Sequence, residues 1–122
     1  MRILHIEPDE YYQHELAKHL DEQFDIITAA DAYTADSLLA SAAPDIVVSE
    51  LLLADGPSYA FLEKLRKQQN NSALPIIIFS SIGELGDIEA TLSLGVAGYF
   101  VKGKDQVNDV KKLLLSLSHH NL

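Results

Sequence analysis

The chain has 122 residues, of which 48% are hydrophobic, and 18 acidic against 9 basic side chains give it a formal net charge of -9. This length predicts one globular domain, residues 1–122, with a single core. The negative charge argues against direct binding of nucleic acid, the absence of cysteine excludes disulfides and favours a cytoplasmic protein, and no apolar run approaches the roughly 20 residues that cross a membrane.

Short apolar segments alternate with stretches of helical period in the first half of the chain. In chain order we expect a strand over 2–6, a helix over 9–23, a strand over 24–30, a helix over 31–43 and a strand over 45–50. Asp31 or Thr34 is the candidate N-cap of the second helix, and Pro44 closes it. The continuous apolar character of the third strand predicts that both of its faces are covered.

The same alternation continues to the end of the chain. We expect a helix that starts at Pro57 or Ser58 and ends in a polar turn, a strand over 75–81, a helix over 85–94 stopped by Gly95, a strand over 98–101 and a helix over 106–120. Five strands in strict alternation with five helices predict a doubly wound parallel sheet with helices on both faces. The expected strand order is 2-1-3-4-5, as in flavodoxin-like domains.

Polar residues stand where four of these strands end. Glu7 and then Asp9 follow the first strand, Glu50 ends the third, Ser80 ends the fourth and Lys102 follows the fifth. Because ligands of such sheets sit outside the carboxyl ends of the strands, we expect these groups to meet in one cleft. A buried ion pair between Glu50 and Lys102 would by itself account for two of them without any signalling role.

Four stretches carry a resemblance to a known family: "RILHIEPDE", "PDIVVSELLLADG", "LPIIIFSS" and "LGVAGYFVKG". They resemble the CheY-like receiver domains of two-component response regulators, and the resemblance extends from residue 2 to about residue 118. In that family an aspartate, with Mg²⁺ bound beside it, accepts a phosphoryl group from a histidine kinase. The resemblance implies Glu50 at the acceptor position, Ser80 as the hydroxyl and Lys102 as the lysine that contact the phosphoryl group, and Tyr99 as the aromatic switch.

The sequence departs from the family pattern at three positions. The acceptor is Glu50 instead of aspartate, Pro8 replaces the second acid after the first strand, and Gly103 replaces the proline after the lysine. Glu7, Asp9 and Glu50 are left as the ligands of a weakened Mg²⁺ site, since proline offers no carboxylate. Gly103 can still form a tight turn, because glycine tolerates positive φ.

We therefore interpret the chain as an atypical, stand-alone pseudo-receiver: a protein interaction module of two-component or phosphorelay signalling, not an enzyme, with no required cofactor. Its expected partners are a histidine kinase or an output protein, and a second copy bound through the last helix and the fifth strand. One alternative is a phosphorylatable receiver that uses Glu50, or less plausibly Asp55, with Mg²⁺. Another is a small flavodoxin-like binding protein, which the acidic, glycine-free "EPDE" loop disfavours.

Overall fold

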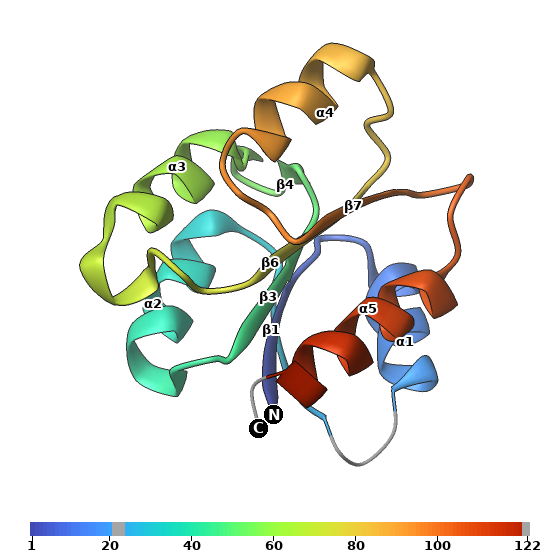
Figure 1. Ribbon diagram of the computed structural model, residues 1–122, viewed down its shortest axis with the longest axis horizontal. Coiled ribbons are helices and arrows are strands. Elements are labelled where there is room, and N and C mark those ends of the chain that lie inside the picture. The colour runs from blue at the N-terminus through green and yellow to red at the C-terminus, as the bar shows by residue number, and fades with distance from the viewer. Residues whose placement is uncertain (21–23, 121–122) are drawn as a thin grey trace.

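The architecture is a parallel sheet between two layers of helices (Figure 1). The computed structural model describes residues 1–20 and 24–120, with side chains up to residue 118. The sheet consists of β1 (Arg2–Ile6), β2 (Asp25–Ala29), β3 (Ile46–Ser49), β6 (Ile76–Ser80) and β7 (Gly98–Val101), in the order β2-β1-β3-β6-β7. All four pairings are parallel, so the predicted order, second-first-third-fourth-fifth, is confirmed.

Two helices cover one face of the sheet and the others cover the opposite face (Figure 1). On the first face lie α1 (Glu10–His19) and α5 (Val107–His120), and on the other α2 (Ala32–Ala42) and α3 (Tyr59–Lys67), with α4 (Leu85–Leu92) beyond them. Leu16 and Leu114 pack with Ile3 and Phe79 on the α1/α5 side, and Leu62 packs with Leu4 on the α2/α3 side. As predicted, β3 is buried along its whole length.

Several element boundaries differ from the predicted ones. The first helix ends at His19 with Leu20 as its C-cap, and the predicted extension over 21–23 lies outside the described residues. Helix α4 ends at Leu92, two residues earlier than predicted, and Gly95 follows with a φ of 75°. A short hairpin of β4 (Leu52–Leu53) and β5 (Gly56–Pro57) and a 3-10 turn η1 (Gln69–Asn71) were not predicted, because segments of two or three residues carry no periodic signal.

Aspartates fix the beginnings of the first two helices. Asp9 accepts a hydrogen bond from the Tyr11 amide at 2.9 Å at the start of α1, and Asp31 accepts one from the Thr34 amide at 2.6 Å at the start of α2. Asp31, one of the two predicted candidates, is therefore the N-cap of α2. Asp55, from the β4–β5 hairpin, adds hydrogen bonds from the amides of Ala32 and Tyr33 at 3.0 and 3.2 Å. The hairpin is thus tied to α2.

Arg66 holds the approach to the last two strands in place. Its guanidinium donates to the carbonyls of Leu74 at 2.6 Å, Leu94 at 2.8 Å and Gly95 at 3.1 Å. These carbonyls belong to the segments that lead into β6 and β7, so one side chain of α3 fixes two connections that are 20 residues apart. Because guanidinium has five donors in a rigid plane, no other side chain could replace these contacts.

His5 is a buried polar residue in the centre of the sheet, between Thr28 of β2 and Val48 of β3. It is 1% exposed, and neither ring nitrogen has a hydrogen-bond partner among the described residues. It is a histidine packed in the core. Burial, with a smaller contribution from the charge of Lys102, lowers the pKa of His5 from 6.5 to about 3. The folded chain therefore keeps this ring neutral at pH values where the unfolded chain protonates it.

No helix among the residues described by the structure is long and apolar enough to cross a membrane.

The buried ring of His5 makes stability depend on pH. We expect the free energy of unfolding to fall as the pH decreases from 6.5 towards 3. The reason is that the His5 ring binds a proton in the unfolded chain but stays neutral in the folded chain. The slope due to this one residue is about 1.4 kcal/mol per pH unit, or roughly 2 kcal/mol between pH 7 and pH 5. Urea unfolding of the wild type and of His5→Leu at both pH values measures it. His14→Leu, which removes an exposed histidine, is the control. Equal pH dependence in the wild type and in His5→Leu would contradict the assignment.

Candidate functional site

The carboxyl ends of β1, β3, β6 and β7 converge on one hollow of about 380 Å³. Its lining comprises Glu7, Pro8, Asp9, Tyr12, Glu50, Leu52, Ser81, Lys102 and Gly103. Strands β1 and β3 are neighbours in the sheet although two helices and another strand separate them in sequence, so the chain reverses its winding direction here. Such a switch point is where doubly wound sheets place their ligands. The structure thus brings Glu7, Glu50 and Lys102 together as the strand ends predicted.

The ammonium group of Lys102 lies between two buried carboxylates. Its Nζ is 2.6 Å from Oε1 of Glu7 and 3.0 Å from Oε1 of Glu50. The three side chains are 7%, 1% and 4% exposed, respectively, so little water reaches the cluster. Ion pairs with so little contact with solvent are weakly screened, and each member depends on the others to compensate its desolvation.

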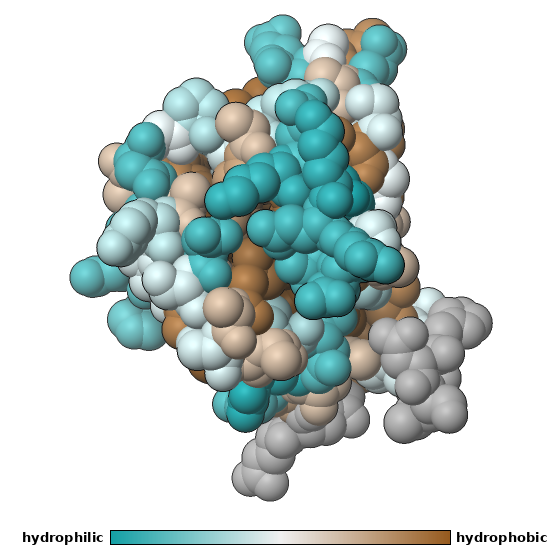
Figure 2. Space-filling model, turned by 90° about the vertical axis from the view of Figure 1, so that its left-hand side faces the viewer, coloured by the Kyte–Doolittle hydropathy of each residue, from teal (hydrophilic) through white to brown (hydrophobic). Residues whose placement is uncertain are grey.

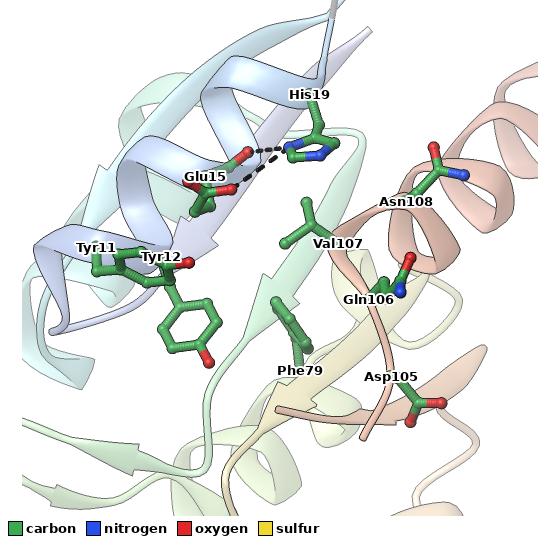
Figure 3. Close-up of a pocket in the computed structure, with 9 residues that line it drawn as sticks. All are labelled: Tyr11, Tyr12, Glu15, His19, Phe79, Asp105, Gln106, Val107 and Asn108. Atoms are coloured by element: carbon green, nitrogen blue, oxygen red, sulfur yellow. Dashed lines mark hydrogen bonds and ion pairs between the residues drawn. The ribbon is translucent and has the colours of Figure 1, made fainter. Parts of the chain in front are cut away.

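Aromatic rings cover the ammonium on the side of α1. Nζ of Lys102 lies 4.2 Å from the centroid of the Tyr12 ring and 5.9 Å from that of Phe79, and the two rings meet edge to face. Figure 3 shows Tyr12 from α1 and Phe79 from β6 at a neighbouring hollow that also includes the start of α5. Ring faces attract cations and exclude water. The contact of these two rings with Lys102 joins three different elements, so no local sequence pattern indicates it.

The carboxylate of Glu50 is saturated with donors. Oε2 accepts hydrogen bonds from the amides of Leu51 and, at 3.3 Å, Leu52. Oε1 accepts from the Ser81 amide at 3.1 Å and the Ser81 hydroxyl at 3.3 Å, in addition to Lys102. Burial by itself would raise the pKa of Glu50, but the hydrogen bond and the positive charge of Lys102 and the hydrogen bond from the Ser81 amide outweigh it and hold the pKa below its usual value. Glu50 is therefore an anion in the folded chain.

Glu7 is held differently. Its Oε2 accepts a hydrogen bond from the Asp9 amide at 3.1 Å and its Oε1 faces Lys102. Burial raises the pKa of Glu7 more than Lys102 and the Asp9 amide lower it, and the nearby charge of Glu50 raises it further. Two carboxylates share one ammonium, and Glu7 is the one that takes up a proton more readily.

The residues at the site do not fit a divalent metal ion. The Asp9 side chain is turned to the start of α1 and Pro8 offers no ligand, while the two remaining carboxylates are engaged by Lys102. Within residues 1–20 and 24–118, no group of three or more His, Asp or Glu side chains is placed to hold a metal ion. Mg²⁺ needs near-octahedral oxygen coordination with carboxylate anchors, whereas an ammonium group stands between the two acids here.

The predicted hydroxyl and aromatic residues are joined through the loop that follows β6. The Ser80 hydroxyl accepts a hydrogen bond from the Ile82 amide at 3.1 Å, and the Tyr99 hydroxyl donates to the Ile82 carbonyl at 2.6 Å. Burial is the main cause that raises the pKa of Tyr99. Both side chains therefore hold the same residue of the loop. The resemblance implied Ser80 as the hydroxyl at this carboxylate, whereas the Ser81 hydroxyl donates to Glu50 at 3.3 Å, because the direction of the chain after β6 decides which serine reaches it.

A tight turn after β7 positions Lys102. Asp105 accepts a hydrogen bond from the Val101 amide at 2.8 Å through its side chain, and its own amide donates to the Val101 carbonyl at 2.7 Å. Gly103 lies within this turn with a φ of 86°, which is unfavourable for other residues. Gly103 therefore forms the tight turn, with positive φ, that its sequence position predicts.

A comparison with known protein families agrees with the architecture and with the polar residues at the strand ends. The family model described as "Response regulator receiver domain" matches residues 3–114. The chain belongs to this family. The fold class and the receiver assignment predicted from the sequence are thereby confirmed, and receiver domains act as signalling modules of two-component systems.

Individual relatives of this receiver extend the comparison. The "Probable transcriptional regulator ycf27" of Porphyridium aerugineum is 33% identical over 79 residues, which cover 65% of this chain and 32% of that protein. The matched part therefore spans about a third of the curated relative. A crystal structure of a two-component response regulator from Clostridium difficile is 26% identical with a TM-score of 0.80, covering 96% of this chain and 98% of the other. The non-phosphorylated HemR receiver domain from Leptospira biflexa is 25% identical with a TM-score of 0.79, covering 97% and 91%.

The ion pairs of Lys102 with Glu7 and Glu50 predict that the receiver is less stable without this lysine. Lys102→Met leaves two buried carboxylates without their cation, so we expect the free energy of unfolding at pH 7 to fall by about 3 to 5 kcal/mol. The deficit should shrink as the pH falls towards 4.5, since burial then raises both folded pKa values and protonation removes the repulsion. Urea unfolding followed by circular dichroism measures both effects.

Lys104→Met is the matched control, because Lys104 is an exposed lysine in the same turn. A deficit of the same size in Lys104→Met, or one that does not change with pH in Lys102→Met, would refute the role assigned to the cluster.

Proposed function

We propose that this receiver acts as a protein interaction module that works without phosphorylation of residue 50. The observation that carries the proposal is the state of the Glu50 carboxylate. It is 4% exposed, and Lys102, Ser81 and the amides of Leu51 and Leu52 already donate to its oxygens. A nucleophilic oxygen needs a free lone pair directed at the incoming phosphorus atom, and every donor here competes for it.

The length of the glutamate side chain supports the same conclusion. Its extra methylene shifts the carboxylate by about 1.5 Å relative to an aspartate on the same backbone. Phosphoryl transfer depends on positioning and charge neutralisation, so an error near 1 Å can cost about 10²-fold in rate. Pro8 removes a carboxylate that would anchor Mg²⁺, which weakens charge neutralisation as well.

The contacts of Glu50 favour a single arrangement of the switch residues. Glu50 bonds to Ser81, while Ser80 and Tyr99 both bond to Ile82 in the next turn of the chain. A carboxylate carries one negative charge, whereas a phosphoryl group carries about -1.5 to -2. Glu50 therefore imitates a phosphorylated site in part, and we expect it to bias the position of Tyr99 by on the order of 1 kcal/mol.

The alternative is a receiver that is phosphorylated on Glu50. Its support is that Lys102 and a serine hydroxyl already contact Oε1 of Glu50, as they would contact phosphoryl oxygens. Asp55 is a weaker acceptor candidate, because both of its oxygens accept hydrogen bonds from amides at the start of α2. The two hypotheses differ in the chemistry of a single carboxylate.

A phosphoryl donor distinguishes the two hypotheses. The protein is incubated with acetyl phosphate or phosphoramidate and Mg²⁺, and its intact mass is measured. We expect no stoichiometric gain of a phosphoryl group, because the Glu50 oxygens are engaged and Mg²⁺ lacks a full ligand set. A hydroxylamine-sensitive adduct mapped to Glu50 would establish the alternative.

The double variant Pro8→Asp, Glu50→Asp is the positive control for this experiment. It restores the second acid after β1 and shortens the acceptor, so we expect Mg²⁺ binding and a phosphoryl adduct if the remainder of the cleft is competent. Glu10→Gln, which changes an exposed acid on α1, should behave as the wild type.

Pairing of two copies is part of the proposal. Strand β7 is an edge strand that pairs only with β6 within the described sheet, and all four of its residues are half-buried. Helix α5 beside it carries the exposed Lys112, whereas α4 carries Asp87 and Glu89 and no basic residue. A two-fold pairing of this face would bring the lysine of one copy to the acids of the other.

Sedimentation velocity over a range of concentrations measures this pairing. We expect a reversible dimer that Lys112→Glu weakens about tenfold through charge repulsion, more strongly at low salt. Lys18→Glu, an equal charge change on the exposed side of α1, is the control and should leave the dimer intact. A monomer at all concentrations would exclude the proposed dimer.

A further inference from the structure

An apolar groove runs between the β4–β5 hairpin and α4, next to the hollow that holds Lys102. Its volume is about 370 Å³. Leu51, Leu52 and Pro57 form the wall on the side of the hairpin, and Asp87, Ala90 and Thr91 form the wall on the side of α4. Tyr59 lies at the groove, and its hydroxyl donates to the Ala90 carbonyl at 3.5 Å.

We propose that this groove is the docking site for an amphipathic, basic segment of a partner protein. The segment would place apolar side chains in the groove and Lys or Arg side chains against the acids of α4. This inference rests on the proposed role as an interaction module and names the partner chemistry.

The preference for apolar side chains in the partner segment follows from the exposure of the apolar residues that line the groove. Leu52 is 50% exposed and Tyr59 is 37% exposed, and both line the groove. Large apolar side chains that gather in a concave surface mark a binding region, whereas single ones scattered over a convex surface do not. Tyr33, which is 81% exposed at the start of α2 and lines none of the described hollows, is an example of the second kind.

The preference for Lys or Arg side chains in the partner segment follows from charge complementarity. Glu84 and Asp87 are exposed and three residues apart at the start of α4, so they lie on the same side of that helix, and Asp87 lines the groove. The segment over 81–97 contains no lysine or arginine. Figure 2 shows polar and apolar surface next to each other at the upper end of the molecule, where α4 lies. The net charge of -9 of the whole chain adds to the attraction for a basic segment.

The walls of the groove are bonded to the residues of the site. On the hairpin side, the amides of Leu51 and Leu52 donate to Glu50, and the Ser58 hydroxyl donates to the Glu50 carbonyl at 3.1 Å. On the other side, Ile82 lines the groove and bonds to both Ser80 and Tyr99. The groove and the site are therefore joined by hydrogen bonds through the hairpin and through Ile82.

The probe for this proposal is a synthetic 14-residue peptide of leucine and lysine with the leucines at helical spacing. A matched peptide with glutamate in place of lysine tests the charge. Binding to the full chain is measured by titration calorimetry, and the binding surface is mapped by amide chemical shifts, without any phosphoryl donor. We expect the lysine peptide to shift the amides of Leu52, Ile82 and Thr91, and the glutamate peptide not to bind.

Two pairs of variants distinguish binding in the groove from non-specific attraction of the peptide to the acidic surface. Leu52→Gln should weaken binding about tenfold and Asp87→Asn about threefold. Tyr33→Gln and Glu10→Gln remove an exposed aromatic ring and an exposed acid elsewhere and should change nothing. Shifts spread over the acidic surface, equal losses in all four variants, no binding, or a dimer that Leu52→Gln dissociates would each overturn the proposal. A phosphoryl adduct on Glu50 would instead overturn the proposed function and leave the peptide result standing.

Discussion

The ammonium of Lys102 between the carboxylates of Glu7 and Glu50 is the interaction on which the functional end of this receiver depends. It joins the tips of three strands, two of which, β1 and β7, never pair with each other in the sheet. The cluster has two acids for one base and little solvent, so its charge balance relies on the amides around Glu50 and on the ease with which Glu7 takes up a proton. Removal of Lys102 leaves two buried carboxylates without their cation.

This arrangement explains why a strand of the core ends in a glutamate. The carboxylate reaches past the end of β3 to a set of donors that the loops after β3 and β6 provide, with Lys102 as the cation. The Glu50 oxygens engage all of these donors in the folded chain. The hairpin and Ile82 carry these contacts onward to the surface between β4 and α4. Site and groove are therefore two ends of one hydrogen-bonded unit.

Much of the fold could be predicted because its signals are local. Runs such as "PIIIF" are too apolar for a half-exposed strand, and the alternation of strands and helices leaves few topologies once crossovers are right-handed. Caps such as Asp31 depend on neighbouring residues and were also predictable. The contacts of Arg66 and Asp55 were not, because they join segments about 20 residues or more apart in sequence and no periodic pattern marks them.

By itself the sequence determined the order of the elements, the family, and which charged groups lie at the carboxyl ends of the strands, since hydrophobic period and strand direction decide these. Tertiary structure decided the rest. It placed Tyr12 and Phe79 around the ammonium, brought the Ser81 hydroxyl to Glu50, and turned the Asp9 side chain to the start of α1. These outcomes depend on the positions of side chains from different elements relative to one another, and such positions are set by packing of the whole core.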